Sequence, residues 1–372
     1  MANFTTNGSY MDKTTYSYLT TESANTYSVG YHEEITIKPF EELKDRTYFG
    51  LGILCLILIP LLCGGNLLVL LSLFIFRKLR SIQNLLIGCL ASFDLLLSIT
   101  CLPTYVVYYW FSDILVKYKY LCIFKYATII GTGTGSLLSL LAIAVDRYIA
   151  VMFPLKYAIK MTMRKARKII IVVWAYTVTI GIIPFFWHNG ERNIGKCDFT
   201  ELLPLYYFLW TVFIFIPAAI ISSTALYLKI YIVAIRQKKK MLQRRSRDTA
   251  SRRQFEKSTK SAFVMAIVLF FFVAFWLPFM VCVNLKILGL EENIFEAIKS
   301  IALTLTQINS GINPVIYCFG KTDFRIAFRL MFEILRGKRQ LNRDACLSEK
   351  KDKDVNRITC ISITDNVEMN ER

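Results

Sequence analysis

Charge is scarce in this chain, and negative charge is the scarcer kind. Only 19% of the 372 residues are charged, and 27 acidic residues are outnumbered by 45 lysines and arginines, which leaves a net charge of +18. Apolar residues make up 55% of the chain and gather in runs of about twenty or more. Such runs exclude a soluble protein, a basic nucleic-acid-binding domain included, because they are typical of membrane spans.

Several chemical signatures are also missing. The two histidines, His32 and His188, are isolated, and no group of cysteines and histidines has zinc-binding spacing. No nucleophile–base pair is visible within the apolar runs, which disfavours a membrane enzyme. The first 46 residues lack the apolar stretch of a cleavable signal peptide, so the first span is expected to act as its own insertion signal. No internal repeat relates early spans to later ones, which disfavours many transporter folds.

Seven intervals are free of charge, apart from Asp94 in the second, and each is long enough to cross a bilayer as a helix. The intervals are Thr47–Phe76, Ser81–Ser112, Tyr126–Val145, Ile169–Gly190, Leu202–Leu228, Ser261–Leu285 and Ser300–Gly320. They are continuous rather than alternating in polarity, which argues against a β-barrel. We therefore predict an all-α membrane protein with a bundle of seven transmembrane helices.

Basic residues indicate which side each connection faces. Four segments hold a charge excess of +21, whereas the opposite set sums to −4, and basic loops remain in the cytoplasm. The four segments are Arg77–Arg80, Tyr148–Lys168, Ala234–Lys260 and Phe319–Arg372. The N-terminus is thus predicted outside the cell and the C-terminus inside. Asn3 and Asn7 begin glycosylation triplets, in agreement with a plasma-membrane protein of this orientation.

This topology divides the chain into four parts. Residues 1–47 form an extracellular segment, 48–320 the seven-transmembrane domain, 321–336 an amphipathic helix and 337–372 a cytoplasmic tail. The amphipathic helix is predicted because its apolar residues fall mostly on one face, away from Arg325 and Arg329. Those apolar residues are Phe324, Ala327, Phe328, Leu330, Met331 and Ile334. We expect this helix to lie in the membrane interface.

Most of the ten cysteines lie within spans, where a thiol is usually an inert apolar group. Cys122 and Cys197 are the two on the oxidising side, and a disulfide between them is the simplest interpretation. Cys346 in the tail is either acylated or a bare thiol.

Asp94 requires a reason, because an ionisable residue inside a bilayer is costly. One interpretation is a structural carboxyl group that is hydrogen-bonded to neighbouring helices. The other is a site for a cation or a proton, since oxygen-bearing residues lie at the same depth on spans three and seven. These are Ser136, Asn309, Ser310 and Asn313. The residues themselves leave both interpretations open.

These features together resemble the rhodopsin-like (class A) G-protein-coupled receptors, over about residues 48–336. The motifs follow one another on the expected spans, which makes the resemblance specific although each motif alone is weak. They are Gly65-Asn66, Leu90-Ala-Ser-Phe-Asp94, Cys122, Asp146-Arg147-Tyr148, Trp174, Phe272 to Pro278, Asn313-Pro314-Val-Ile-Tyr317 and Phe324. The resemblance implies a receptor that makes or breaks no covalent bond and shifts between two states of a helix bundle.

The resemblance also implies roles for individual residues. Arg147 would hold the resting state through Asp146, and Trp276 would relay ligand contact to a movement of span six. The residues implied in coupling and activation are Asp146, Arg147, Tyr148, Leu155, Phe272, Trp276, Asn313, Pro314 and Tyr317. The partners implied are a heterotrimeric G protein at Leu155 and the Arg236–Arg253 stretch, an extracellular small ligand and the bilayer, without nucleic acid. No cofactor is implied beyond an allosteric sodium ion, whose site matches Asp94, Ser136, Asn309, Ser310 and Asn313.

The ligand is less well specified. Ile129 stands where amine receptors carry an aspartate, which disfavours a monoamine. Local stretches around Ser136 and Cys197 resemble adenosine receptors, and Phe199 matches the aromatic residue that stacks on adenine there. Val283 and Gln307, however, replace two polar residues that bind adenosine in that family. The predicted pocket comprises Ile129, Ile130, Phe199, Trp276, Phe279, Met280 and Gln307, and an apolar pocket of this kind equally suits a lipid or aromatic ligand.

Two departures and several alternatives complete the sequence-based interpretation. Tyr227 follows Pro217 by ten residues rather than the usual eight. Ser258 stands where many relatives carry an acid that pairs with Arg147, which predicts raised basal signalling. The alternatives are a class A receptor for an amine, lipid or peptide, a transporter or channel, and a scaffold or decoy that never couples.

Overall fold

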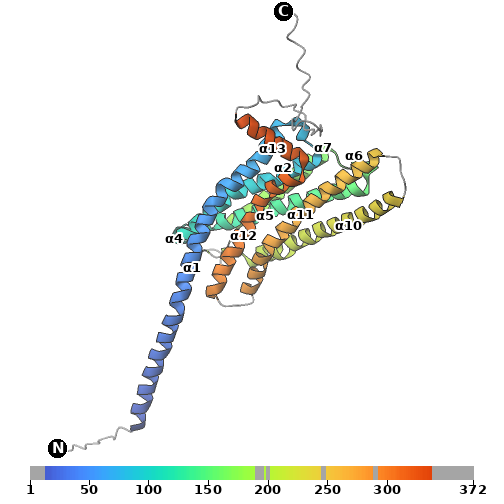
Figure 1. Ribbon diagram of the computed structural model, residues 1–372. Helices are drawn as coiled ribbons and strands as arrows, with labels where there is room; N and C mark the ends of the chain where they lie inside the picture. Colours follow the sequence, from blue (N-terminus) through green and yellow to red (C-terminus); the bar gives the residue numbers. More distant parts are fainter. Residues whose placement is uncertain (1–12, 189–196, 198–201, 244–248, 288–291, 337–372) are drawn as a thin grey trace, which may run out of the picture.

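A computed structural model describes residues 13–188, 197, 202–243, 249–287 and 292–336. Within these ranges the chain is built from helices, with short connections and no strand. The helices pack side by side into one elongated bundle (Figure 1). The predicted glycosylation sites Asn3 and Asn7, the pocket residue Phe199 and the tail residue Cys346 lie outside the described residues.

Helix α1 (Lys13–Ile75) is much longer than a membrane requires, and its first half projects beyond the bundle (Figure 1). Its apolar part lies within Glu42–Ile75 and matches the first predicted span. The sequence did not predict helix before residue 47, because that region has no apolar run to suggest one.

The second span, Ile82–Trp110, is one continuous path with a local irregularity. Helix α2 (Ile82–Leu96) begins at Ser81, whose side chain accepts a hydrogen bond from the Asn84 backbone N–H at 3.3 Å. A π-helical turn η2 (Leu97–Cys101) then leads into α3 (Leu102–Trp110). Proline in the first turn of α3 cannot donate to the preceding carbonyls, and such irregular turns accommodate that loss.

Helix α5 (Lys119–Met152) forms the centre of the bundle, with 72% of its most apolar window buried. It contacts α2, α7 (Met163–Phe186), α10 (Ile216–Gln243) and α11 (Thr249–Ile287). The short elements are η1 (Arg77–Leu79), α4 (Ser112–Lys117), η3 (Pro154–Lys156), α6 (Tyr157–Lys160), α9 (Leu205–Phe208) and the π-turn η4 (Leu209–Phe215). The bundle closes with α12 (Glu292–Gly320), followed by α13 (Thr322–Leu335).

Six helical segments of the described chain are long and apolar enough to cross a membrane. They lie at Glu42–Ile75, Ile82–Trp110, Lys119–Met152, Met163–Phe186, Leu209–Gln237 and Phe255–Cys282, and they match the first six predicted spans. Helix α12, which contains the predicted seventh span, packs against α1 and α11. It is less apolar than the others because Gln307, Asn309 and Asn313 interrupt its aliphatic residues.

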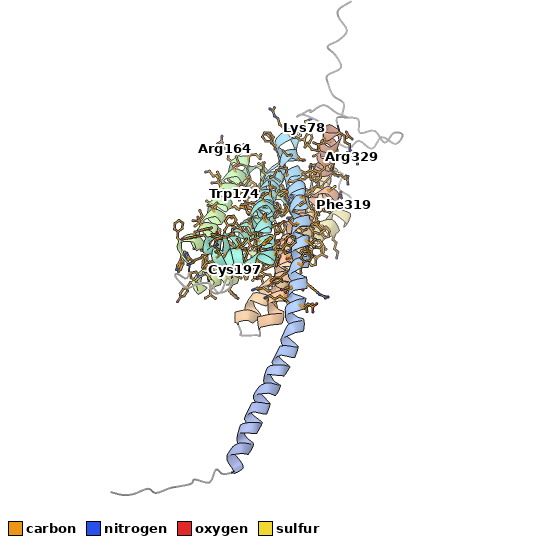
Figure 2. The ribbon with its side chains drawn as sticks, turned by 90° about the vertical axis from the view of Figure 1, so that its left-hand side faces the viewer. Lys78, Arg164, Trp174, Cys197, Phe319 and Arg329 are labelled. Atoms are coloured by element: carbon orange, nitrogen blue, oxygen red, sulfur yellow. A yellow bond between two sulfur atoms is a disulfide. The ribbon has the colours of Figure 1, made fainter. Side chains whose placement is uncertain are left out.

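The bundle exposes apolar side chains and buries polar ones, as a membrane environment requires. Phe74, Ile171, Ile221 and Phe270 are each at least 65% exposed, on four different helices. Cations gather toward one end of the bundle, where Lys78, Arg164 and Arg329 lie, whereas Cys197 lies at the other end (Figure 2).

The Cys122 end of α5 is fixed by a disulfide and by aromatic contacts. Cys122 is bonded to Cys197, which confirms the predicted pair. Next to it, the Tyr126 hydroxyl donates a 2.9 Å hydrogen bond to the Cys197 carbonyl. The buried Lys125 ammonium lies 3.4 Å from the ring centroid of Tyr108, a cation–π contact that links α5 to α3.

Candidate functional site

The fully buried Asp94 carboxylate joins three helices. Ser136 of α5 donates to Asp94 Oδ1 at 3.1 Å, and Ser310 of α12 donates to the same oxygen at 2.8 Å. The Asn313 amide donates to Oδ2 at 2.7 Å. The carboxylate therefore receives hydrogen bonds from each side, which offsets part of the cost of burying it.

The fourth predicted neighbour, Asn309, is buried in the same stretch of α12. Its side-chain oxygen makes no hydrogen bond within the described structure. Nearby, the Asn66 amide of α1 donates to the Ser310 carbonyl at 3.2 Å and to the Leu62 carbonyl at 3.1 Å. The polar centre of the bundle thus extends from α1 through α12 to α2 and α5.

A small apolar cavity lies nearer the Cys122 end of the bundle, between α5, α10, α11 and α12. Its lining consists of Tyr126, Ile129, Ile130, Val212, Ile216, Trp276, Phe279, Met280 and Leu303. Five of the seven predicted pocket residues line it. Gln307 does not: it lies against α1, where its side-chain oxygen accepts from the Cys55 thiol at 3.9 Å.

Three aromatic side chains of α11 extend inward from this cavity. The rings of Phe272 and Trp276 are stacked with their centroids 5.4 Å apart, and Phe279 meets Trp276 edge-on at 6.3 Å. Gly133 of α5 makes room for the indole ring, because a Cβ there would lie 2.4 Å from a ring carbon of Trp276. The absence of a side chain at Gly133 therefore fixes how closely α5 and α11 approach each other.

The opposite end of α5 carries a buried ion pair. Arg147 donates to Asp146 Oδ2 through Nε at 2.9 Å and through Nη2, and Asp146 is fully buried. The Tyr157 hydroxyl of α6 donates to Asp146 Oδ1 at 2.7 Å. Burial and the Asp146 charge raise the pKa of Tyr157, so this hydroxyl remains a donor. Sequence analysis did not select Tyr157, because a tyrosine in a short loop carries no distinguishing signal.

The remaining predicted coupling residues lie at the centre of the bundle and toward its Arg147 end. Tyr317 is fully buried, and its ring lies 5.8 Å from that of Phe324 on α13. Pro314 approaches α1 closely, since a Cβ on Gly65 would lie 3.1 Å from it. Tyr148 packs at the edge of the core, and Leu155 is 95% exposed.

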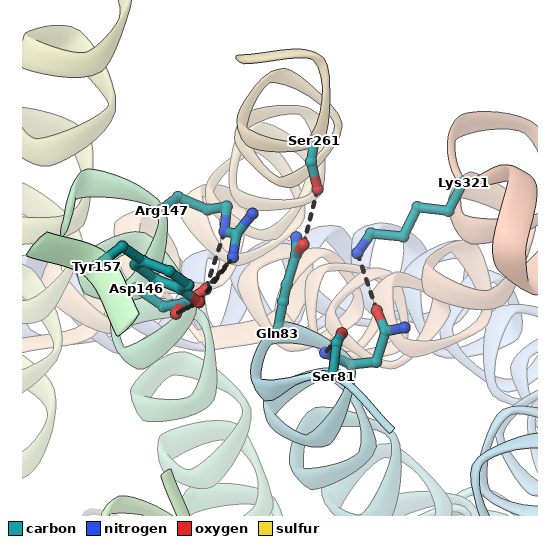
Figure 3. A network of polar contacts seen from close by, with 8 residues as sticks. Ser81, Gln83, Asp146, Arg147, Tyr157, Ser261 and Lys321 are labelled. Carbon is teal, nitrogen blue, oxygen red and sulfur yellow. Dashed lines mark hydrogen bonds and ion pairs between the residues drawn. The ribbon is translucent and has the colours of Figure 1, made fainter. Parts of the chain in front are cut away.

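A lysine lies beside the same cluster. The Lys321 ammonium, between α12 and α13, donates to the Asn84 side-chain oxygen of α2 at 3.2 Å (Figure 3). Burial, and then the positive charge of Arg147, lower the pKa of Lys321 from its usual 10.5 to about 7. Sequence analysis also missed Lys321, because basic residues are common just after a last span.

Comparison with known families identifies the class. The 7 transmembrane receptor (rhodopsin family) profile matches residues 65–317, so the chain belongs to the rhodopsin family of seven-transmembrane receptors. It is a multi-pass membrane protein, and the resemblance found in the sequence is confirmed.

Its relatives include adenosine receptors. The chain is 28% identical to adenosine receptor A2b of Homo sapiens over 309 residues, which cover 77% of this chain and 90% of the relative. The Rattus norvegicus receptor A2b has the same identity and coverage. Adenosine receptor A2a of Canis lupus familiaris is 28% identical over 283 residues, which cover 71% of this chain and 68% of the relative.

The close contact at Gly133 generates a first prediction. Gly133→Ala forces the Trp276 ring to move, and we expect a loss of about 1–3 kcal/mol in unfolding free energy. Gly131→Ala is the matched control, since its Cβ would meet Gly181 at an ordinary 3.6 Å. Thermal unfolding in detergent and near-ultraviolet circular dichroism measure both effects. Equal behaviour of the two variants would contradict the packing described.

A second prediction concerns pH. Because the pKa of Lys321 is lower in the folded protein, the unfolded chain binds more protons between pH 7 and 10.5, and stability rises with pH there. From pH 7 to 9 this gain reaches at most about 3 kcal/mol. We expect Lys321→Met to remove it and the exposed-site control Lys78→Met to retain it, in thermal unfolding at both pH values. A rise that survives in Lys321→Met would refute the assignment.

Proposed function

We propose that the chain is a G-protein-coupled receptor that transmits the binding of an extracellular small ligand to intracellular heterotrimeric G proteins. The observation that carries this proposal is the path along α11. Trp276 lines the apolar cavity and stacks on Phe272. The same helix continues to the end of the bundle where the Asp146–Arg147 pair is buried. A ligand that prefers one position of Trp276 thereby changes the population of bundle conformations.

The proposal includes a topology. Helix α12 is the seventh span, the N-terminus is extracellular and the end that carries Lys78, Arg164 and Arg329 faces the cytoplasm. The charge excess of the four basic segments supports this orientation. Helix α13 lies in the cytoplasmic membrane interface, with Phe324, Phe328 and Met331 buried against the bundle.

The cavity geometry favours an apolar ligand, either a lipid or an aromatic molecule. Its described lining offers one hydroxyl, that of Tyr126, which already donates to the Cys197 carbonyl. A nucleoside has several polar groups, each of which loses free energy when buried without a partner. An adenosine-like ligand is the second candidate, supported by the relatives described as adenosine receptors.

We further propose that the Asp94 cluster holds a sodium ion. The residues fit such an ion: one buried carboxylate, the hydroxyls of Ser136 and Ser310, and the Asn309 oxygen that makes no hydrogen bond. A hard monovalent cation binds oxygen atoms of this kind. A bound cation would favour the compact arrangement in which α2, α5 and α12 converge on Asp94.

The receptor proposal predicts ligand-dependent nucleotide exchange. Purified receptor with G proteins is exposed to lipids, aromatic acids, nucleosides, amines and peptides. For the ligand that activates, Phe279→Ala should lower potency about tenfold by removing cavity contacts, whereas Leu277→Ala, which is 57% exposed on the same helix, should not.

Two results would decide against parts of this proposal. Activation by adenosine, unaffected by Phe279→Ala, would reject the apolar ligand. A transporter or channel would be indicated instead by two results together. Nucleotide exchange would be equal in wild type and Arg147→Ala with every ligand, and the protein would carry solute flux in proteoliposomes.

Sodium binding is tested without signalling. We expect sodium chloride to raise the unfolding temperature of the purified protein relative to choline chloride at equal ionic strength, because a ligand of the folded state stabilises it. Asp94→Asn should abolish the difference, and Asp113→Asn, at an exposed carboxylate, should preserve it. An unchanged sodium response in Asp94→Asn would exclude this site.

A further inference from the structure

One hydrogen bond connects α11 directly to α2 at the end of the bundle that holds Arg147. The Ser261 hydroxyl donates to the Gln83 side-chain oxygen at 2.8 Å (Figure 3). Gln83 is 6% exposed, and Ser261 is half-buried. A bond in such surroundings is shielded from water, which would otherwise compete for both groups.

The α2 side of this bond is held in place. Ser81 caps the helix, and the Asn84 amide donates to the Leu79 carbonyl at 2.9 Å. The other end of the Asn84 side chain accepts from Lys321. The first turn of α2 is therefore attached to the corner between α12 and α13, so that Gln83 provides a fixed point for α11.

Packing beside Ser261 follows the same arrangement. Val264, three residues further along α11, lies against Gly320 at the end of α12, where a Cβ would come within 2.7 Å of Val264. A displacement of α11 away from the bundle would break the Ser261–Gln83 hydrogen bond and the Val264–Gly320 contact together. The hydrogen bond and the Val264 contact thus belong to one closed arrangement of this end of α11.

Arg147 is bound elsewhere. Its described hydrogen bonds go to Asp146 and Tyr157, on α5 and α6, and not to α11. Ser258, at the register where an acid would reach Arg147, carries no charge. Contacts other than an ion pair with Arg147 must therefore hold α11 against the bundle.

We propose that the Gln83–Ser261 hydrogen bond is a latch that favours the closed position of α11 and thereby sets the basal activity of the receptor. The effect of the latch on basal activity rests on the proposed signalling function. Its effect on the position of α11 does not, because that position is a property of the helix bundle. The latch would lower basal signalling, whereas the neutral Ser258 by itself predicts that basal signalling is raised. One hydrogen bond is sufficient to change a two-state population several-fold.

The latch is tested first by the position of α11. Spin labels are attached at Lys78→Cys and Lys260→Cys, both exposed, in a chain with Cys346→Ser and Cys360→Ser. Double electron–electron resonance then gives the populations of short and long distances. We expect Ser261→Ala and Gln83→Leu each to increase the ratio of open to closed forms roughly three- to tenfold. The double variant should match the single ones, because all three remove the same bond.

Two controls separate the latch from a general loosening. Ser258→Ala removes a hydroxyl one turn away on α11 and should leave the distances unchanged. Ser261→Thr retains the hydroxyl and should remain closed. Additive effects of Gln83→Leu and Ser261→Ala, or an equal effect of Ser258→Ala, would overturn the latch.

Basal nucleotide exchange is measured on the same variants. Exchange that rises in Ser261→Ala together with the open population supports the latch as a regulator. If neither the wild type nor any variant catalyses nucleotide exchange at all, the signalling proposal fails, while the distance measurement still decides on the latch. Closed distances in Ser261→Ala and Gln83→Leu, with wild-type basal exchange, would reject the latch and leave the signalling proposal intact.

Discussion

The burial of polar groups inside an apolar bundle is the constraint on which the rest of this structure depends. A bilayer offers no water to Asp94, so its carboxylate takes hydrogen bonds from Ser136, Ser310 and Asn313. Those three residues belong to α5 and α12, and Asp94 itself to α2. The requirement to satisfy one charge therefore fixes the positions of three helices. The apolar cavity and the Asp146–Arg147 pair lie on either side of this charge along α5.

Small side chains set the remaining geometry. Gly133 admits the Trp276 ring, and Gly320 admits Val264, so α11 approaches α5 and α12 at two levels. Between those levels, the Phe272 ring stacks on that of Trp276. These two close contacts and the Ser261–Gln83 hydrogen bond hold α11 against its neighbours, and packed interfaces of this kind tend to change between discrete arrangements rather than continuously.

The sequence-based interpretation succeeded where the physical signal was local. Charge-free runs located the first six spans, the two cysteines in or next to predicted connections identified the disulfide, and the motif order identified the family. It failed to select Tyr157, Gln83 and Lys321, because tyrosine, glutamine and lysine are ordinary residues in a connection or near the end of a helix. Gln307 was expected in the pocket because of its position along the seventh predicted span. The rotation of α12 about its axis instead directs this side chain toward Cys55 of α1.

Charge-free apolar runs by themselves determined that this protein is a helical membrane protein, and its ordered motifs resembled those of the rhodopsin family. These signals are local because a lipid-facing helix must be apolar over its whole length. The tertiary structure alone decided which buried polar groups meet, that Gln307 lies outside the apolar cavity, and that α11 is hydrogen-bonded to α2 rather than to Arg147. Such pairings depend on helix rotation and on close approach at single glycines, which no pattern along one helix records.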